Sequence, residues 1–249
     1  MGHRPSVSRT VRLAHLSLGP RTSYLFLNVR VPPFDDPSVR RALNFAIDRQ
    51  AIVRDVFGAR GVVTCQILPP TFPGYVPYCP YTKDPDGSWS RPNLAKAKKL
   101  VDRSGTAGSQ VAVWFPPPGE WFQESIPVAD EVVDVLRTLG YHPRRVEGMR
   151  SSDIGYSGFV ADYPAESGFI PPLLACDSYY NLGGFCDPDI DARMRKSARI
   201  ASTNPQRSHQ LWSEIEHILV DRATLVPLLN IRHVTLASQR LSNFLFSPA

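Results

Sequence analysis

Short apolar runs typical of strands alternate along this chain with segments whose apolar residues recur at helical spacing. In the last helical segment, for example, Trp212, Ile215 and Leu219 share one face. A chain that alternates in this way buries its helices against a sheet, so the order predicts an α/β fold. Strands are expected at 24–29, 111–115, 141–146, 153–160, 223–229 and 233–237, and helices at 37–47, 49–57, 94–103, 120–139, 188–202 and 205–221.

Several expected helices begin with an acid or amide followed by proline. The pairs Asp36-Pro37, Asp187-Pro188 and Asn204-Pro205 place a side-chain acceptor at the N-cap. Proline then occupies the first helical position, where its missing N–H costs no hydrogen bond. Pro127 lies within the expected helix 120–139, so it either bends that helix or marks its true start.

The two ends of the chain differ from the middle. Residues 1–20 show weak patterning and are expected to be irregular, whereas the first 30 and last 20 residues contain apolar strands without an evident partner. We therefore hypothesise that these strands pair with a sheet supplied by another part of a longer protein.

Charge and hydropathy exclude several classes of protein. Lys and Arg number 28 against 23 Asp and Glu, and the net charge of +5 is spread along the chain without a basic stripe. This distribution argues against a nucleic-acid partner. No apolar run approaches the roughly 20 residues that a membrane helix needs. Met1 leads into polar sequence rather than a signal peptide, so the chain is expected to be cytosolic or a piece of something longer.

The four cysteines form two local pairs, Cys65 with Cys79 and Cys176 with Cys186. Both intervening segments are rich in turn residues, so each pair can approach to disulfide distance. Buried free thiols are the alternative, and zinc is disfavoured because there is no CxxC and no histidine at ligand spacing. Disulfides would indicate an oxidising compartment outside the cytoplasmic membrane.

The sequence shows no nucleophile motif such as GxSxG or SxxK, and its paired carboxylates are interpreted as caps and turns. Asp162 differs, because it follows the apolar strand 153–160 and precedes a loop. Open α/β sheets bind ligands at the ends of their strands, and a carboxylate there can hold an ammonium group. An ordinary loop cap is the alternative at this position.

Three stretches of the chain, taken together, resemble the family-5 solute-binding proteins of peptide and nickel ABC importers. The first is Tyr24-Leu25-Phe26-Leu27-Asn28-Val29 and the following run through Pro32-Pro33-Phe34-Asp35-Asp36-Pro37 to Asp48-Arg49. The second is Gly158-Phe159-Val160-Ala161-Asp162-Tyr163-Pro164, with Phe169 after it. The third is Phe185-Cys186-Asp187-Pro188-Asp189-Ile190-Asp191, followed by Leu211-Trp212 and Val226-Pro227-Leu228.

The resemblance covers about residues 20–245 and only the C-terminal half of the family. It implies the type II periplasmic-binding-protein fold of the peptide-binding subclass, with this chain as lobe two. Residues 1–30 would belong to or lead from lobe one, 31–230 would form lobe two, and 231–249 would return towards lobe one. The N-terminal lobe of the same protein would then be a missing partner.

The resemblance also implies a ligand site. Asp162 corresponds to the aspartate that holds the α-ammonium group of a bound peptide, Phe159 replaces the usual tryptophan as an apolar wall, and Tyr163 completes the motif. Tyr156 stands where relatives can carry an arginine for the ligand carboxylate, so the resemblance does not extend to carboxylate recognition. Trp121 is a candidate for the pocket rim.

The function expected from this resemblance is non-catalytic binding of a small solute, a peptide or other amine-bearing compound, for ABC permease subunits. The protein would act outside the cytoplasmic membrane, with a lipid anchor in its full-length form, and without a metal or cofactor. One alternative is a ligand-sensing domain of a longer regulatory protein. Another is a hydrolase that uses Asp162 or Glu166, although the chain shows no nucleophile–base pair.

Overall fold

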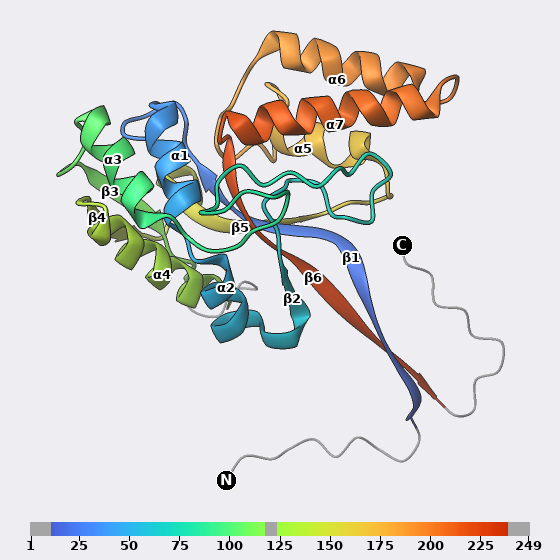
Figure 1. Cartoon of the computed structure of the whole chain (residues 1–249), viewed down its shortest axis with the longest axis horizontal. Helices are drawn as coiled ribbons and strands as arrows, with labels where there is room; N and C mark the ends of the chain where they lie inside the picture. The colour runs from blue at the N-terminus through green and yellow to red at the C-terminus, as the bar shows by residue number, and fades with distance from the viewer. Residues whose placement is uncertain (1–10, 118–123, 239–249) are drawn as a thin grey trace.

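The computed structural model describes residues 11–117 and 124–238, which fold around one mixed sheet of six strands (Figure 1). The strand order is β2-β6-β1-β5-β3-β4. The strands are β1 (Val11–Leu27), β2 (Gly61–Val63), β3 (Gln110–Trp114), β4 (His142–Val146), β5 (Ile154–Val160) and β6 (Leu225–Ser238). Strand β3 runs parallel to β4 and β5, and the remaining pairs are antiparallel. The α/β expectation is confirmed.

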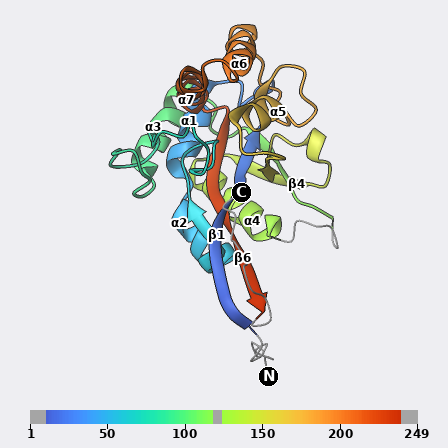
Figure 2. The same cartoon turned by 90° about the vertical axis from the view of Figure 1, so that its right-hand side faces the viewer.

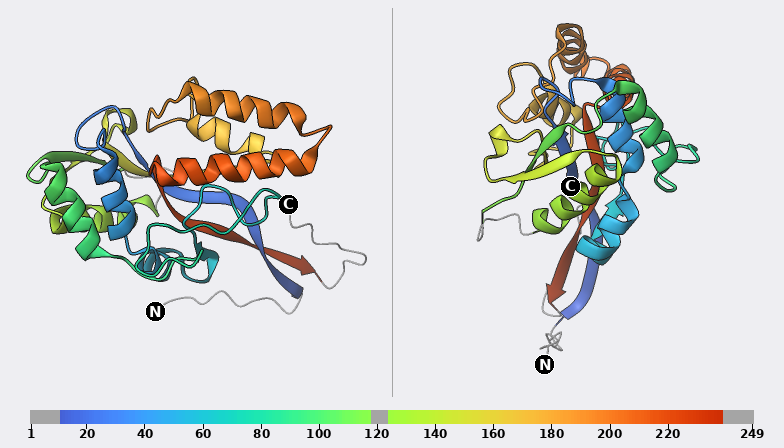
Figure 3. Two further views of the ribbon diagram at one scale, coloured as in Figure 1. Left: turned by 45° about the horizontal axis from the view of Figure 1, so that its top comes forward. Right: turned by 90° about the vertical axis from the view of Figure 1, so that its left-hand side faces the viewer.

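The helices lie on both sides of this sheet (Figures 1 and 3). Helices α6 and α7 pack side by side, and Ser208 of α7 donates a hydrogen bond to the carbonyl of Ser197 in α6 at 2.9 Å. The α-helices are α1 (Pro37–Ala46), α2 (Arg49–Ile52), α3 (Leu94–Ser104), α4 (Ser125–Thr138), α5 (Ile170–Leu174), α6 (Pro188–Ile200) and α7 (Pro205–Asp221). Shorter turns are η1 (Val53–Phe57), η2 (Gly58–Arg60), η3 (Met149–Ser151) and η4 (Glu166–Gly168).

The helix starts agree with the expected caps. The side chains of Asp36, Asp187 and Asn204 each accept backbone N–H bonds from the first turn, and proline follows in every case. Helix α4 begins at Ser125, so Pro127 lies in its first turn, where no helical hydrogen bond is lost. The expected helix 49–57 is divided into the short α2 and the π-helical turn η1.

The long strands β1 and β6 pair with each other, and this corrects two expectations. Residues 11–20 are extended rather than irregular, and the two strands expected near the C-terminus form one continuous strand. The terminal strands therefore find partners within this chain, as the pairing of Leu25 with Val226 shows. Their outer parts leave the body of the molecule as a two-stranded ribbon (Figure 2), formed by residues 11–20 and 231–238.

The ribbon meets the body at an irregularity in the β1–β6 ladder. The register shifts between Leu18 and Thr22, so that extra residues of β1 oppose β6 at this point. Gly19 lies in the shift, and a Cβ atom there would approach the His233 ring to 2.2 Å. Glycine is therefore required for the close approach of the two strands where the ribbon begins. The division at residues 30 and 230 stays a prediction, since β1 and β6 run from ribbon into sheet without a break.

Two buried arginines, Arg40 of α1 and Arg49 of α2, bind carbonyls that lie in β6 or just before it. The Arg49 side chain is 1% exposed; its Nε donates to the carbonyl of Pro227 at 2.7 Å and its Nη1 to the carbonyl of Asn44 at 2.9 Å. Burial lowers the pKa of Arg49 to about 9. Arg40 donates to the carbonyls of Phe34 and Ala223 in the same manner. These guanidinium groups satisfy buried carbonyls that lie outside regular pairing.

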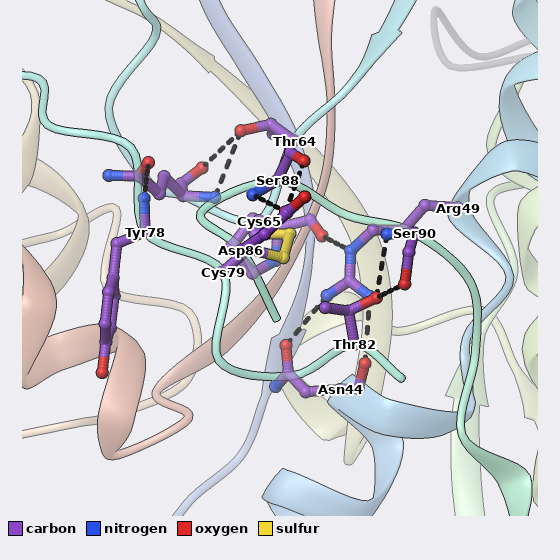
Figure 4. Close-up of a disulfide and its surroundings, with 12 residues drawn as sticks. Asn44, Arg49, Thr64, Cys65, Tyr78, Cys79, Thr82, Asp86, Ser88 and Ser90 are labelled. Carbon is purple, nitrogen blue, oxygen red and sulfur yellow. Dashed lines mark hydrogen bonds between the residues drawn. A yellow bond between two sulfur atoms is a disulfide. The ribbon is translucent and has the colours of Figure 1, made fainter. Parts of the chain in front are cut away.

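A long loop between β2 and α3 is closed by the Cys65–Cys79 disulfide, which lies near Arg49 and Asn44 (Figure 4). The fully buried Glu216 of α7 accepts hydrogen bonds from the Leu68 N–H at 2.7 Å and from Gln66 Nε2 at 3.1 Å. A second buried carboxylate, Glu166, accepts from the Gly74 N–H. The loop is thus held by one covalent link and by two acids from distant elements.

We expect the Cys65→Ala/Cys79→Ala double variant to lose about 3 kcal/mol of unfolding free energy, because a disulfide of this loop length restricts the unfolded chain by roughly that amount. Urea denaturation followed by circular dichroism measures the loss. The Cys65→Ser/Cys79→Ser variant, which keeps Cys176–Cys186, serves as the control for the substitutions themselves. Equal midpoints and slopes for variant and oxidised wild type would contradict the expectation.

Burial raises the pKa of Glu216 from its ordinary value of 4.5 to about 8. Between these values the folded state holds the proton that the unfolded state releases, so the unfolding free energy falls as pH rises. Relative to Glu216→Gln, the wild type should lose about 1 kcal/mol per pH unit between about pH 5.5 and 7.5. Urea denaturation of both proteins across this pH range measures the difference in unfolding free energy. The other titratable groups are common to both proteins, so their contributions cancel in this difference. Parallel stability curves would contradict the shift.

Candidate functional site

Asp162 lies just beyond the end of β5, where the ribbon joins the body. The N–H of Ala161 donates to the carbonyl of Pro20 at 3.0 Å, which fixes the backbone immediately before Asp162. The Asp162 side chain is exposed, and no described residue forms a hydrogen bond or ion pair with its carboxylate. The carboxylate is therefore free to meet a cation from outside the described chain.

Phe159 is half-buried and contacts two other aromatic rings edge to face. Its ring centroid lies 5.2 Å from that of the buried Phe169 and 5.8 Å from that of Tyr180. Tyr180 in turn contacts Tyr179 at 5.6 Å, and the Arg150 guanidinium lies over the Tyr179 ring at 4.7 Å. We call Phe159, Tyr180 and Tyr179 the aromatic row. Tyr179 is 75% exposed and Tyr180 57%, so the row presents large apolar rings to solvent.

Tyr163 is 52% exposed and lies over Gly168. A Cβ atom at Gly168 would come within 2.8 Å of the Tyr163 ring, so the absence of a side chain there allows this contact. Gly168 directly precedes Phe169, the ring on which Phe159 rests. Tyr163 therefore borders the same surface as Phe159.

Tyr156 does not lie on this surface. It is separated from Phe159 by three positions on β5, and residues an odd number apart point to opposite faces of a strand. Its side chain is 1% exposed, its hydroxyl donates to Ser23 Oγ at 3.0 Å, and burial raises its pKa. The structure thus places Tyr156 in the core, and we do not carry it into the proposed site. Trp121 lies outside the described residues.

A polar cavity of about 480 Å³ lies at the other end of β5. It opens between the end of β1, the turn η3 and the loop that contains the second disulfide. The sequence did not predict this cavity, because its walls come from three separate segments. The one sequence feature that pointed to this region was the pair of adjacent tyrosines in the loop between Cys176 and Cys186. Its lining residues are Asn28, Arg30, Val31, Arg150, Cys176, Asp177, Ser178, Asn181, Leu182 and Gly184.

The disulfide Cys176–Cys186 closes the loop that forms one wall of this cavity. Together with Cys65–Cys79 it confirms both expected local pairings. The Asn181 side chain donates to the carbonyls of Ala175 and Phe185, at 3.0 and 2.6 Å, and so ties the two ends of the loop a second time. In the part of the chain that the structure describes, no cluster of His, Cys, Asp and Glu is arranged to hold a metal ion.

No helix among the described residues is long and apolar enough to cross a membrane.

Solved structures of binding proteins share the fold. The structure of HbpA2 from Haemophilus parasuis superposes with a TM-score of 0.82 at 22% identity, over 95% of this chain and 47% of that one. A dipeptide binding protein from Pseudoalteromonas sp. SM9913, in complex with Met-Leu, gives 0.77 at 22% identity, over 98% and 49%.

Sequence comparison identifies the family. The model of bacterial extracellular solute-binding proteins, family 5 Middle, matches residues 6–180, and the chain belongs to this family. The glutathione-binding protein GsiB of Salmonella typhimurium is 24% identical over 242 residues, which cover 90% of this chain and 45% of that protein. The chain thus spans about half the length of the curated relatives it matches. The family is one of solute-binding proteins, which confirms the expectation of a binding protein rather than an enzyme.

Proposed function

We propose that this chain forms half of an extracytoplasmic binding protein that takes up an amine-bearing, peptide-like solute for an ABC importer. The observation that carries the proposal is the exposed, unpaired carboxylate of Asp162 beside the aromatic row. A carboxylate supplies the charge that an ammonium group needs, and exposed aromatic rings supply apolar surface for the solute's side chains.

The same geometry predicts weak binding by this chain alone. A charge-assisted hydrogen bond contributes about 1.5–3 kcal/mol when water is excluded, but an exposed ion pair contributes less than about 1 kcal/mol. Asp162 is exposed in this chain, so a second surface must cover it before the pairing becomes strong. We propose that the missing N-terminal lobe supplies that surface by closing over the solute.

The ribbon supports the presence of such a lobe. Leu16, Val234 and Leu236 are 48%, 55% and 59% exposed on strands that project from the body (Figure 2). Apolar side chains in this number on one ribbon favour contact with further protein. A lipid anchor and the ABC permease partner remain part of the proposal.

The printed names of relatives support the solute class and the location. They include a probable di/tripeptide-binding protein of Pseudomonas aeruginosa and a probable ABC transporter periplasmic-binding protein, SapA, of Escherichia coli. The two disulfides are consistent with an oxidising compartment.

Titration of the ¹⁵N-labelled chain with Met-Leu tests the role of Asp162. We expect amide shifts around Phe159–Tyr163 that saturate only at millimolar peptide, and roughly three- to fivefold weaker binding for N-acetyl-Met-Leu or for Asp162→Asn, because either change removes one solvent-exposed ion pair worth less than about 1 kcal/mol.

Asp102→Asn is the matched control, since Asp102 is an exposed acid on α3, away from β5. It should bind Met-Leu as the wild type does. Equal affinity of the free and acetylated peptides, or undiminished binding by Asp162→Asn, would refute the assignment of the ammonium group. Micromolar binding by this chain would refute the need for a covering lobe.

A further inference from the structure

The cavity beside the Cys176–Cys186 disulfide presents two guanidinium groups from different parts of the chain. Arg30 follows β1, and Arg150 lies in η3. Both side chains are exposed, and neither forms an ion pair with a carboxylate among the described residues. By contrast, Arg145 of β4 is paired with Asp130 at 2.6 Å. Two unpaired cations on the wall of one hollow indicate a site for an anion.

Arg30 is held in place by a glycine. Its Nε donates to the carbonyl of Gly184 at 2.9 Å, and a Cβ atom at Gly184 would come within 2.6 Å of that nitrogen. Gly184 also has a φ of +66°, which glycine adopts without strain. The Nη groups of Arg30 make no hydrogen bond to any described residue. The side chain is thus oriented through one nitrogen while its forked end stays available.

Arg150 is oriented by stacking. Its guanidinium carbon lies 4.7 Å from the centroid of the Tyr179 ring. A cation over a ring uses the face of the guanidinium group and leaves its N–H edges free for an oxygen ligand. Because Tyr179 ends the aromatic row, the cavity and the row are continuous at Arg150.

One acid restricts the kind of anion. Asp177 lines the same cavity, so the wall carries two cations and one anion, together with the polar groups of Ser178 and Asn28. A carboxylate with a neighbouring N–H donor matches this set, because the oxygens meet the arginines and the N–H meets Asp177. The C-terminus of a peptide has this arrangement. The cavity volume of about 480 Å³ is within the range of small-ligand pockets.

The cavity and Asp162 lie at opposite ends of β5. Asn28 donates to the carbonyl of Asp153 at the start of the strand, whereas Ala161 donates to Pro20 at its end. At about 3.3 Å per residue, the two ends are on the order of 20–30 Å apart. An extended peptide advances about 3.3–3.6 Å per residue, so roughly six to nine residues are needed to reach from one to the other.

We propose that the cavity binds the terminal carboxylate of the solute through Arg30 and Arg150, and that the solute is an oligopeptide whose amine lies at Asp162 and whose chain follows the aromatic row. The proposal rests on the proposed function and deepens it by stating the length and the second charged end of the solute. In this arrangement Arg30 and Arg150 bind the carboxylate that an arginine at the position of Tyr156 can bind in relatives.

Peptides of alternating alanine and serine, with two, four, six and eight residues and with free or amidated C-termini, test this proposal by NMR titration of the chain. We expect amidation to weaken binding of the octapeptide roughly tenfold and to leave the dipeptide unchanged, because only the longer peptide reaches both ends. The octapeptide should shift amides at 176–184 at a lower concentration than the dipeptide does, because its amine end is held at Asp162 at the same time. The Arg30→Gln/Arg150→Gln variant should reproduce the effect of amidation on the wild type.

Arg144→Gln is the matched control, since Arg144 is exposed on β4 and does not line the cavity. A second titration needs no peptide and compares sodium acetate with sodium chloride at equal ionic strength. Acetate should shift the Arg30 and Gly184 amides in the wild type and not in the double variant. Circular dichroism verifies that the variants are folded.

Insensitivity to amidation at every length, or equal sensitivity of dipeptide and octapeptide, would overturn the inference. The proposed function would survive either result if N-acetylation still weakened binding. If binding depended neither on N-acetylation nor on Asp162, the proposed function would be overturned, and the inferred length of the peptide with it. The acetate titration would still test whether the cavity binds a carboxylate.

Discussion

The antiparallel pairing of β1 with β6 is the interaction on which the rest of the structure depends. It joins strands from opposite ends of the chain, and β1 then carries β5 on its other edge. Because β1 spans the whole length of β5, it places Pro20 beside the segment that ends in Asp162 and Asn28 beside Asp153. Both charged ends of the proposed site are therefore positioned by the main chain of one strand.

Buried charged side chains complete this framework by binding backbone groups rather than one another. Arg40 and Arg49 donate to carbonyls of loops and of β6, and Glu166 and Glu216 accept N–H groups of the loop that Cys65–Cys79 closes. Backbone groups in irregular segments lack the partners that helices and sheets provide, so ionic side chains satisfy them. These bonds attach the loop 64–93 to α7 and η4.

Much of the fold could be predicted from local pattern. Caps such as Asp187-Pro188 and the apolar run of β5 act over a few residues, and both disulfides close short segments. The ribbon could not be predicted, because residues 11–20 become a strand only by pairing with β6. For the candidate site, the motif around Asp162 was readable from sequence. The burial of Tyr156 could also have been predicted, because residues three positions apart on a strand point to opposite faces and Tyr156 therefore points away from Phe159.

The sequence by itself determined the α/β class, the family, the cysteine pairs and the acid at the end of β5, since each rests on residues close together along the chain. Only the tertiary structure decided that Arg30, Arg150 and the 176–186 loop share one cavity, and that it lies a strand's length from Asp162. Strand pairing over long sequence separations sets these distances, and neither spacing nor composition records which strands will pair.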